Sequence, residues 1–158
     1  MESTSTTHNT FVLDRVYTRP PARVFAAVAD PAKKRRWFAE GEHHIVEEFQ
    51  TEFRVGGAER LRYRLGPGTP FPGLILVNEG LYLDIVLERR VVMAHAMTLA
   101  DRRISAALVT IELHPDPAGT RLVCTFQAAY FEGADGPQIR EMGWKGLLDR
   151  LGNTLDTP

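Results

Sequence analysis

The sequence predicts an α+β fold in which one curved antiparallel sheet of about six to seven strands wraps around a long C-terminal helix. Two observations lead to this prediction. Residues 74–130 contain four long runs rich in β-branched and aromatic residues, separated by short connections, which is typical of an antiparallel meander. A long run with helical spacing then follows, and a sheet of this size needs a cover over one of its faces.

Size and composition predict a single domain. The chain has 158 residues, of which 44% are hydrophobic and 25% charged, and this is enough apolar material for one core. We assign this domain to residues 10–158, and we expect the polar residues 1–9 to be a disordered lead-in. The formal net charge of -1 gives no reason to expect nucleic acid as a partner.

The sequence also carries information on the compartment. The first ten residues lack the charged and apolar regions of a signal peptide, and no apolar run reaches the roughly 18 residues that cross a bilayer. Cys124 is the only cysteine, so no intrachain disulfide can form and a reducing compartment is permitted. We therefore expect a cytoplasmic protein that does not insert into membranes.

The first elements are a strand and two short helices. Residues 10–19 form the predicted strand because Phe11 and Leu13 alternate with polar residues, and a pair of prolines ends it. Residues 22–30 have apolar side chains at helical spacing and predict a short helix. Residues 31–38 predict a second short helix, with a proline in its first turn.

Two strands follow, over residues 43–55 and 58–65, and we expect the pair Gly56–Gly57 to form a two-residue hairpin turn between them. Four longer strands are predicted at residues 74–86, 90–99, 104–113 and 120–130.

The closing helix, residues 136–151, buries a stripe that contains Trp144 and Leu147. Gly143 lies on the flank of this stripe. Its missing side chain either lets the helix approach the sheet or leaves room for a ligand.

Two groups of basic residues are predicted to face solvent. Arg60, Arg62 and Arg64 alternate with apolar residues on one strand, so we expect them to form an exposed face that pairs with glutamates of a neighbouring strand. The run Lys33–Arg36 is typical of a solvated helix face.

The sequence contains no nucleophile elbow, Walker loop or paired metal-site cysteines. The adjacent His43 and His44 would point to opposite faces of a strand, so we expect neither a metal site nor a cofactor. Cys124 is expected to be a small buried core residue.

The candidates for acid–base chemistry are His95 first, followed by Glu79, Asp84 and Glu112. His95 lies in the middle of a strand, where it is either a packed core residue or a polar anchor that lines a cavity.

Aromatic residues and methionines come from nearly every predicted element, and a curved sheet under one helix can enclose an apolar cavity with them. The residues that we predict to contact a ligand there are Trp37, Phe38, Tyr63, Phe71, Tyr82, His95, Met97, Phe126, Gly143, Trp144 and Leu147. The ligand expected in such a cavity is a small apolar or aromatic molecule.

Several local strings resemble a known family. They are "RPPARVFAAVADPAKKRRWF", "FRVGGAERLRYR", "GLYLDIVLERRVVMAHAM", "GTRLVCTFQAAYFEGAD" and "GWKGLLDRL", and they occur in the family's order over roughly residues 10 to 156. The chain resembles the helix-grip superfamily of START and birch-pollen-allergen-like domains (SRPBCC). Within it, the chain is most similar to the homologues of the heat-shock-protein-90 ATPase activator.

The resemblance implies a sheet that grips the C-terminal helix, with a cavity between them that often accepts apolar small molecules. It implies no shared catalytic residue, and it leaves three functions open. The first is a binding protein for an apolar or amphipathic small molecule. The second is an enzyme, similar to cyclases or hydrolases, that acts in the same cavity. The third is a co-chaperone that stimulates a heat-shock-protein-90 ATPase; a chaperone partner is possible but not favoured.

Overall fold

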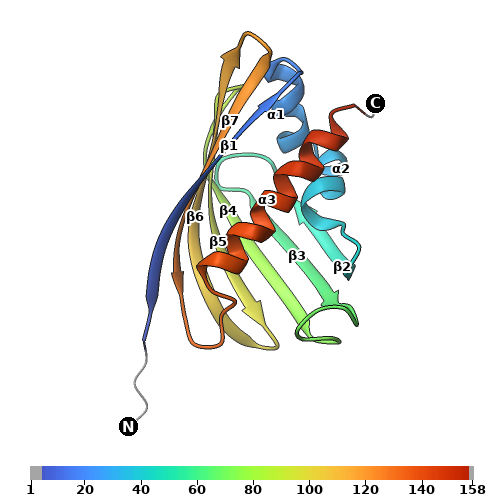
Figure 1. Cartoon of the computed structure of the whole chain (residues 1–158), viewed down its shortest axis with the longest axis vertical. Coiled ribbons are helices and arrows are strands. Elements are labelled where there is room, and N and C mark those ends of the chain that lie inside the picture. Colours follow the sequence, from blue (N-terminus) through green and yellow to red (C-terminus); the bar gives the residue numbers. More distant parts are fainter. Residues whose placement is uncertain (1–4, 157–158) are drawn as a thin grey trace.

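The computed structural model describes residues 5–156, which form one seven-stranded antiparallel sheet and several helices that lie against it (Figure 1). The strand order is β1-β7-β6-β5-β4-β3-β2. The strands are β1 (Thr7–Tyr17), β2 (His44–Thr51), β3 (Ala58–Leu65), β4 (Ile75–Val86), β5 (Arg90–Leu99), β6 (Arg102–Asp116) and β7 (Gly119–Tyr130). The helical segments are α1 (Pro21–Ala29), α2 (Pro31–Lys34), the π-helix η1 (Arg35–Ala39) and α3 (Pro137–Thr154). The predicted fold class and helix-grip architecture are confirmed.

The first strand starts earlier than predicted. Thr7, His8 and Asn9 pair with residues of β7, so β1 begins three residues before the expected start at residue 10. The expectation of a disordered lead-in is therefore wrong for these three residues, because their backbone groups complete the edge of the sheet. Residues 1–4 of that lead-in lie outside the described part of the chain.

The connection between β2 and β3 is longer than the predicted two-residue turn. β2 ends at Thr51, and residues 52–57 form the connection. Gly56 has a φ of +83°, and a Cβ on Gly57 would clash with the carbonyl oxygen of Glu52. Both glycines are thus required, one for its backbone conformation and one for close packing. Within the connection, the backbone N–H of Arg54 donates to the carbonyl oxygen of Glu52 and that of Gly57 to the carbonyl oxygen of Arg54, each at 2.8 Å.

The arginines of β3 lie on the outer face of the sheet, as predicted. Arg60 contacts Glu48 of β2 at 3.3 Å, and Arg62 and Arg64 contact Glu47 at 3.0 and 3.2 Å. These exposed pairs give the outer face its charged character, and each contributes little to stability.

The two short helices pack Trp37 and Phe38 into the core. Asp30 caps α2 by accepting a hydrogen bond from the backbone N–H of Ala32 at 2.9 Å. In η1, the indole Nε1 of Trp37 donates to the carbonyl oxygen of Ala27 at 2.8 Å. The prediction that the basic run Lys33–Arg36 faces solvent is wrong for Lys34, which points inward and is only 3% exposed.

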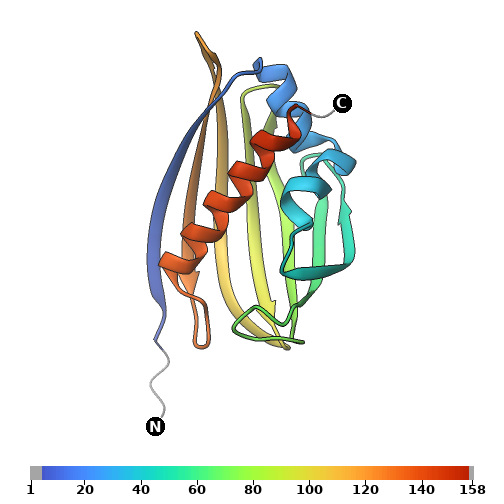
Figure 2. The same ribbon diagram turned by 45° about the vertical axis from the view of Figure 1, so that its right-hand side comes forward.

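Helix α3 runs obliquely over the concave face of the sheet (Figure 2). Trp144, Leu148 and Leu151 are buried against the sheet. The C-terminal half of the helix packs closely against the end of β1, where a Cβ on Gly152 would lie 3.0 Å from the Tyr17 ring. Among the helices within residues 5–156, none is both long and apolar enough to span a membrane.

Candidate functional site

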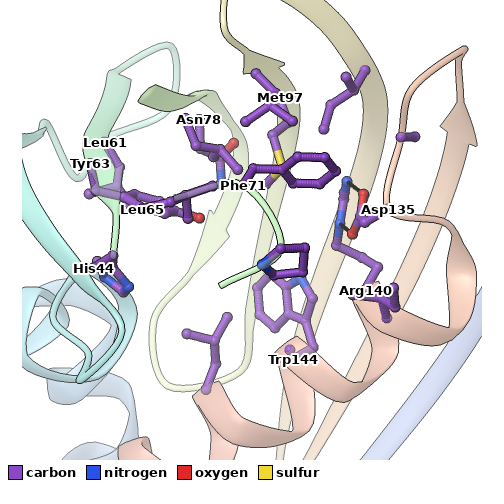
Figure 3. Close-up of a pocket in the computed structure, with 18 of the residues that line it drawn as sticks. His44, Leu61, Tyr63, Leu65, Phe71, Asn78, Met97, Asp135, Arg140 and Trp144 are labelled. Carbon is purple, nitrogen blue, oxygen red and sulfur yellow. Dashed lines mark hydrogen bonds and ion pairs between the residues drawn. The ribbon is translucent and has the colours of Figure 1, made fainter. Parts of the chain in front are cut away.

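A pocket of about 490 Å³ lies between α3 and strands β2 to β6 (Figure 3). It is open to solvent. Its walls combine strand residues that face the helix, one aromatic residue of η1, the loop between β3 and β4, the loop between β7 and α3, and the first four turns of α3. The lining residues are Phe38, His44, Leu61, Tyr63, Leu65, Pro70, Phe71, Leu76, Asn78, Met97, Leu99, Ile104, Ala134, Asp135, Ile139, Arg140, Gly143, Trp144, Leu147 and Arg150.

Most of this wall is apolar, which follows from the strand pattern. Leu61, Tyr63 and Leu65 occupy every second position of β3, so all three point toward the concave side. The loop of residues 66–73 adds Phe71, whose side chain is partly exposed at the edge of the pocket. The arrangement suits an apolar molecule, because its surface would leave water on entering.

One side of the pocket is polar and centres on Arg140 (Figure 3). The guanidinium Nε donates to Asp135 Oδ2 at 2.8 Å, and Nη2 donates to Asp135 Oδ1 at 2.7 Å and to Ser105 Oγ at 3.0 Å. The same guanidinium lies 5.2 Å from the centre of the Tyr130 ring. Because Arg140 is only 7% exposed, its position is fixed by these partners.

Asn78 and His95 lie next to this polar group. Together with Ser105 and Arg140 they border a second, separate cavity of about 10 Å³, enough for one water molecule. Asn78 Oδ1 and His95 Nε2 are buried and have no hydrogen-bond partner within residues 5–156. Burial lowers the pKa of His95 to about 4, the nearby charges of Lys34 and Arg140 act in the same direction, and Glu59 opposes them. His95 is therefore neutral at pH 7.

The opposite side of the pocket is formed by His44 and Tyr63 (Figure 3). Their rings lie 4.3 Å apart, and Nε2 of His44 contacts the carbonyl oxygen of Ala39 at 2.6 Å. Burial raises the pKa of Tyr63 to about 12, so its hydroxyl stays protonated at neutral pH. Tyr63 therefore offers a neutral hydroxyl group on this side of the pocket.

Seven of the eleven residues predicted to contact a ligand line the main pocket. They are Phe38, Tyr63, Phe71, Met97, Gly143, Trp144 and Leu147. The other four do not. Trp37, Tyr82 and Phe126 are packed in the core and at most 2% exposed, and His95 lines only cavities of about 10 Å³. That the seven touch a ligand stays a prediction.

Gly143 occupies an open position. A Cβ placed on it would meet nothing within 4 Å, so the alternative of close helix packing is wrong at this residue, and the residue leaves space in the pocket instead. The close approach belongs to Gly152, which the sequence analysis did not single out.

Sequence reasoning missed the polar residues of the pocket. Asn78 has the strand parity of the buried Leu76, and Arg140 lies four residues before Trp144 on the buried stripe of α3. These two positions could have been recognised in the sequence, because a polar residue at a core-facing position is a candidate for a functional site. The pairing with Asp135 was not visible, because it depends on the loop conformation before the helix.

The acid–base candidates other than His95 lie away from the pocket. Glu79 pairs with Arg60, and Asp84 pairs with Arg90, each at 2.7 Å on the outer face. Glu112 lies between two buried residues of β6 and so points to the same outer face.

A second buried charge pair lies deeper in the core. Lys34 Nζ is 2.6 Å from Glu59 Oε1 and donates to the hydroxyl of Tyr82 at 3.3 Å. Burial alone would lower the pKa of Lys34, but the Glu59 carboxylate and Tyr82 raise it above its ordinary value. Burial alone would raise the pKa of Glu59, but Lys34 lowers it. Both groups are thus charged and mutually stabilised.

The sequence profile of the "Activator of Hsp90 ATPase homolog 1-like protein" family matches residues 18–156. The chain belongs to this family. The activator-homologue family is part of the superfamily that the sequence resembles, so the resemblance is confirmed.

Solved structures show the same fold as this activator-homologue chain. An uncharacterized protein from Rhizobium leguminosarum is 34% identical over 99% of this chain and 100% of its own, with a TM-score of 0.89. The Mll3558 protein from Rhizobium loti is 39% identical over 95% of this chain and 99% of its own, with a TM-score of 0.84. An AHSA1-like protein from Aeromonas hydrophila shares the fold at 19% identity, over 94% of this chain and 92% of its own, with a TM-score of 0.68. No curated protein matches the chain significantly.

Proposed function

We propose that this protein is a cytoplasmic binding protein that holds a small molecule with a largely apolar body in the pocket beneath α3. The observation that carries the proposal is the pocket itself. It measures about 490 Å³, opens to solvent and is lined mostly by apolar and aromatic side chains. This volume lies within the range of about 300–1,000 Å³ that is typical of small-molecule sites.

The surroundings of the pocket support a site that exists before a ligand arrives. Phe38 and Trp144 are buried and in mutual contact, with ring centroids 6.3 Å apart, so two of the walls are held by core packing. Gly143 contributes space without a side chain. A pocket whose walls are fixed in this way requires little ordering on binding, which favours affinity.

The test is a titration with N-phenyl-1-naphthylamine, a neutral dye whose emission increases in apolar surroundings. We expect one dye molecule to bind per chain with a Kd in the micromolar range, on the order of 1–50 μM. The matched control is Gly143→Leu, which places a side chain in the open space beside the dye site. Equal binding by the two proteins would contradict the proposal, as would no binding by the natural protein.

A second candidate function rests on the outer face. A groove of about 340 Å³ there is lined by Arg60, Arg62, Arg103, Glu79 and Asp101, together with Val77 and Thr98. Complementary charges across an interface speed the encounter of two proteins and select the partner. Together with the family description, the groove supports contact with a heat-shock-protein-90 homologue.

This second candidate is tested with the ATPase of the host's own heat-shock-protein-90 homologue. If contact occurs through the groove, the chain raises the ATPase rate, and Arg103→Glu reduces the stimulation because it reverses one charge of the groove. Gly143→Leu should stimulate as well as the natural chain, since it changes only the pocket. No stimulation at tens of micromolar protein would exclude this candidate in the tested conditions.

A further inference from the structure

The polar side of the pocket offers a ligand more hydrogen-bond donors than acceptors. Of the guanidinium nitrogens of Arg140, Nε and Nη2 donate to Asp135 and Ser105, whereas Nη1 donates to no other residue within the range 5–156. Both carboxylate oxygens of Asp135 already accept from Arg140. Nη1 is therefore a cationic donor without a partner among these residues, while each carboxylate oxygen of Asp135 already accepts one hydrogen bond.

Asn78 adds a second donor beside this one. Its side chain makes no hydrogen bond to another described residue, and it borders both the main pocket and the cavity of about 10 Å³. Oδ1 is completely buried, which leaves Nδ2 as the amide atom that a molecule in the pocket can reach. Figure 3 shows Asn78 and Arg140 on strand and helix walls that face the same space.

The formal charges of the lining residues also favour a negatively charged ligand. Among the arginine and aspartate side chains that line the pocket, Arg140 and Arg150 contribute two positive charges and Asp135 one negative charge, which leaves one net positive charge. Because the surrounding wall is apolar, this charge is screened less than it would be on an open surface. A cation in the pocket would meet repulsion, and an uncharged molecule would offer Nη1 at most a neutral acceptor instead of a negatively charged one.

We propose that the ligand is an amphipathic acid, with an apolar body against the leucine and aromatic wall and a carboxylate that binds Arg140 Nη1 and Asn78 Nδ2. This inference rests on the proposed binding function and adds the chemical class of the ligand. His44 and Tyr63 lie on the opposite side of the pocket, and Nε of Arg150 donates to the carbonyl oxygen of Trp37 at 3.3 Å, so we assign the carboxylate end to Arg140 and Asn78.

The test compares decanoate with decan-1-ol as competitors of bound N-phenyl-1-naphthylamine at pH 7. The two molecules share the ten-carbon chain and differ in the charged end. We expect decanoate to displace the dye at a concentration about tenfold lower, which is the size expected when a negatively charged acceptor replaces a neutral one opposite the guanidinium. Equal or better displacement by decan-1-ol would overturn the inference and leave the apolar binding function intact. If the dye itself does not bind, the binding function fails, and this inference fails with it.

Two variants change the preference in opposite directions, so a loss of folding cannot imitate both results. Arg140→Met should remove the tenfold preference for decanoate and leave displacement by decan-1-ol unchanged. Asp135→Asn removes the negative charge of the pocket and should strengthen decanoate binding several-fold. Lys145→Met is the matched control, because it also removes one positive charge from α3 but at an exposed site that does not line the pocket. An unchanged preference in Arg140→Met, or weaker decanoate binding in Asp135→Asn, would overturn the inference.

Discussion

Lys34 of α2 and Glu59 of β3 form an ion pair inside the core, with 2.6 Å between Nζ and Oε1 and side chains that are 4% and 2% exposed. The pair joins the helical segment to the sheet across 25 residues of sequence, and the hydroxyl of Tyr82 contacts both partners. Every charge in this cluster has a partner, which is the condition under which a buried ion pair is tolerated.

Removing one partner of this pair should be strongly destabilising. Glu59→Leu leaves the Lys34 ammonium buried without a counter-charge, and we expect the free energy of unfolding to fall by about 3–5 kcal/mol. The double variant Lys34→Met with Glu59→Leu should lose less, because it leaves no unpaired charge. Urea unfolding of the two variants checks this. A double variant that is less stable than Glu59→Leu alone would contradict the account.

His95 should make the protein less stable at mildly acidic pH. The unfolded chain binds a proton on this ring at about pH 6.5, but the folded chain does so only at about pH 4, because burial disfavours the charged form. Stability therefore falls as the pH is lowered from 6.5 to 4, by roughly 3 kcal/mol in total, and this contribution stops changing below pH 4.

The variant His95→Phe isolates this effect. In this variant the free energy of unfolding should no longer fall between pH 7 and pH 5, as measured by urea unfolding at several pH values. Glu59 acts in a different window, since its lowered pKa gives stability above about pH 4.5 that is lost as the pH falls through its folded value. If the stability of His95→Phe changed with pH above pH 5 as steeply as that of the natural protein, another group would be responsible for the pH dependence.

Gly143→Leu should fill the pocket without straining the fold. A side chain there meets open space, and leucine has a helix propensity better than glycine by nearly 1 kcal/mol. We expect dye binding to weaken at least tenfold, while the urea midpoint stays equal or rises. Loss of stability together with loss of binding would mean that the helix needs the glycine for packing.

The other two glycines of α3 should respond differently to alanine. At Gly146 the nearest atom to a new Cβ is 3.8 Å away, so Gly146→Ala should stabilise the protein by up to about 1 kcal/mol. At Gly152 the Cβ would lie 3.0 Å from the ring of Tyr17, which is held by a 2.7 Å hydrogen bond to the carbonyl oxygen of Leu148. Gly152→Ala should therefore be less stable than Gly146→Ala. Thermal unfolding of both variants provides the comparison, and equal gains would show that Tyr17 moves freely.

Cys124 should be inert in the folded protein. It is fully buried, and burial raises the pKa of its thiol to about 12, so almost no thiolate is present at neutral pH. Reaction with a chromogenic disulfide reagent should be slow in buffer and complete in denaturant. Rapid labelling of the native protein would indicate local opening around β7.

The strands could be predicted because their information is local. The runs rich in β-forming residues, bounded by short connections, predicted the bounds of β5 without error and placed β4, β6 and β7 within a few residues. The prediction of a two-residue turn between β2 and β3 was wrong. Gly57 is needed because a side chain there would clash with the carbonyl oxygen of Glu52, and not because it belongs to a hairpin turn.

The polar interior could not be predicted from spacing alone. Lys34 belongs to a run of four basic residues, which is usually solvated, and only the partner on β3 explains its burial. Arg140 is held by Asp135 of a loop and Ser105 of β6, and no local pattern relates these three residues. The apolar part of the pocket, in contrast, followed from aromatic residues on faces that the sequence already indicated.

The two tryptophans of the chain lie in different surroundings. Trp144 borders the main pocket, whereas Trp37 is only 1% exposed and is fixed by its hydrogen bond to Ala27. The intrinsic emission of the protein thus contains one ring in contact with the pocket and one that is shielded from it. In a Trp37→Phe variant the remaining indole would report pocket occupancy directly, without any added fluorophore, so unlabelled candidate molecules could be screened by their effect on its spectrum.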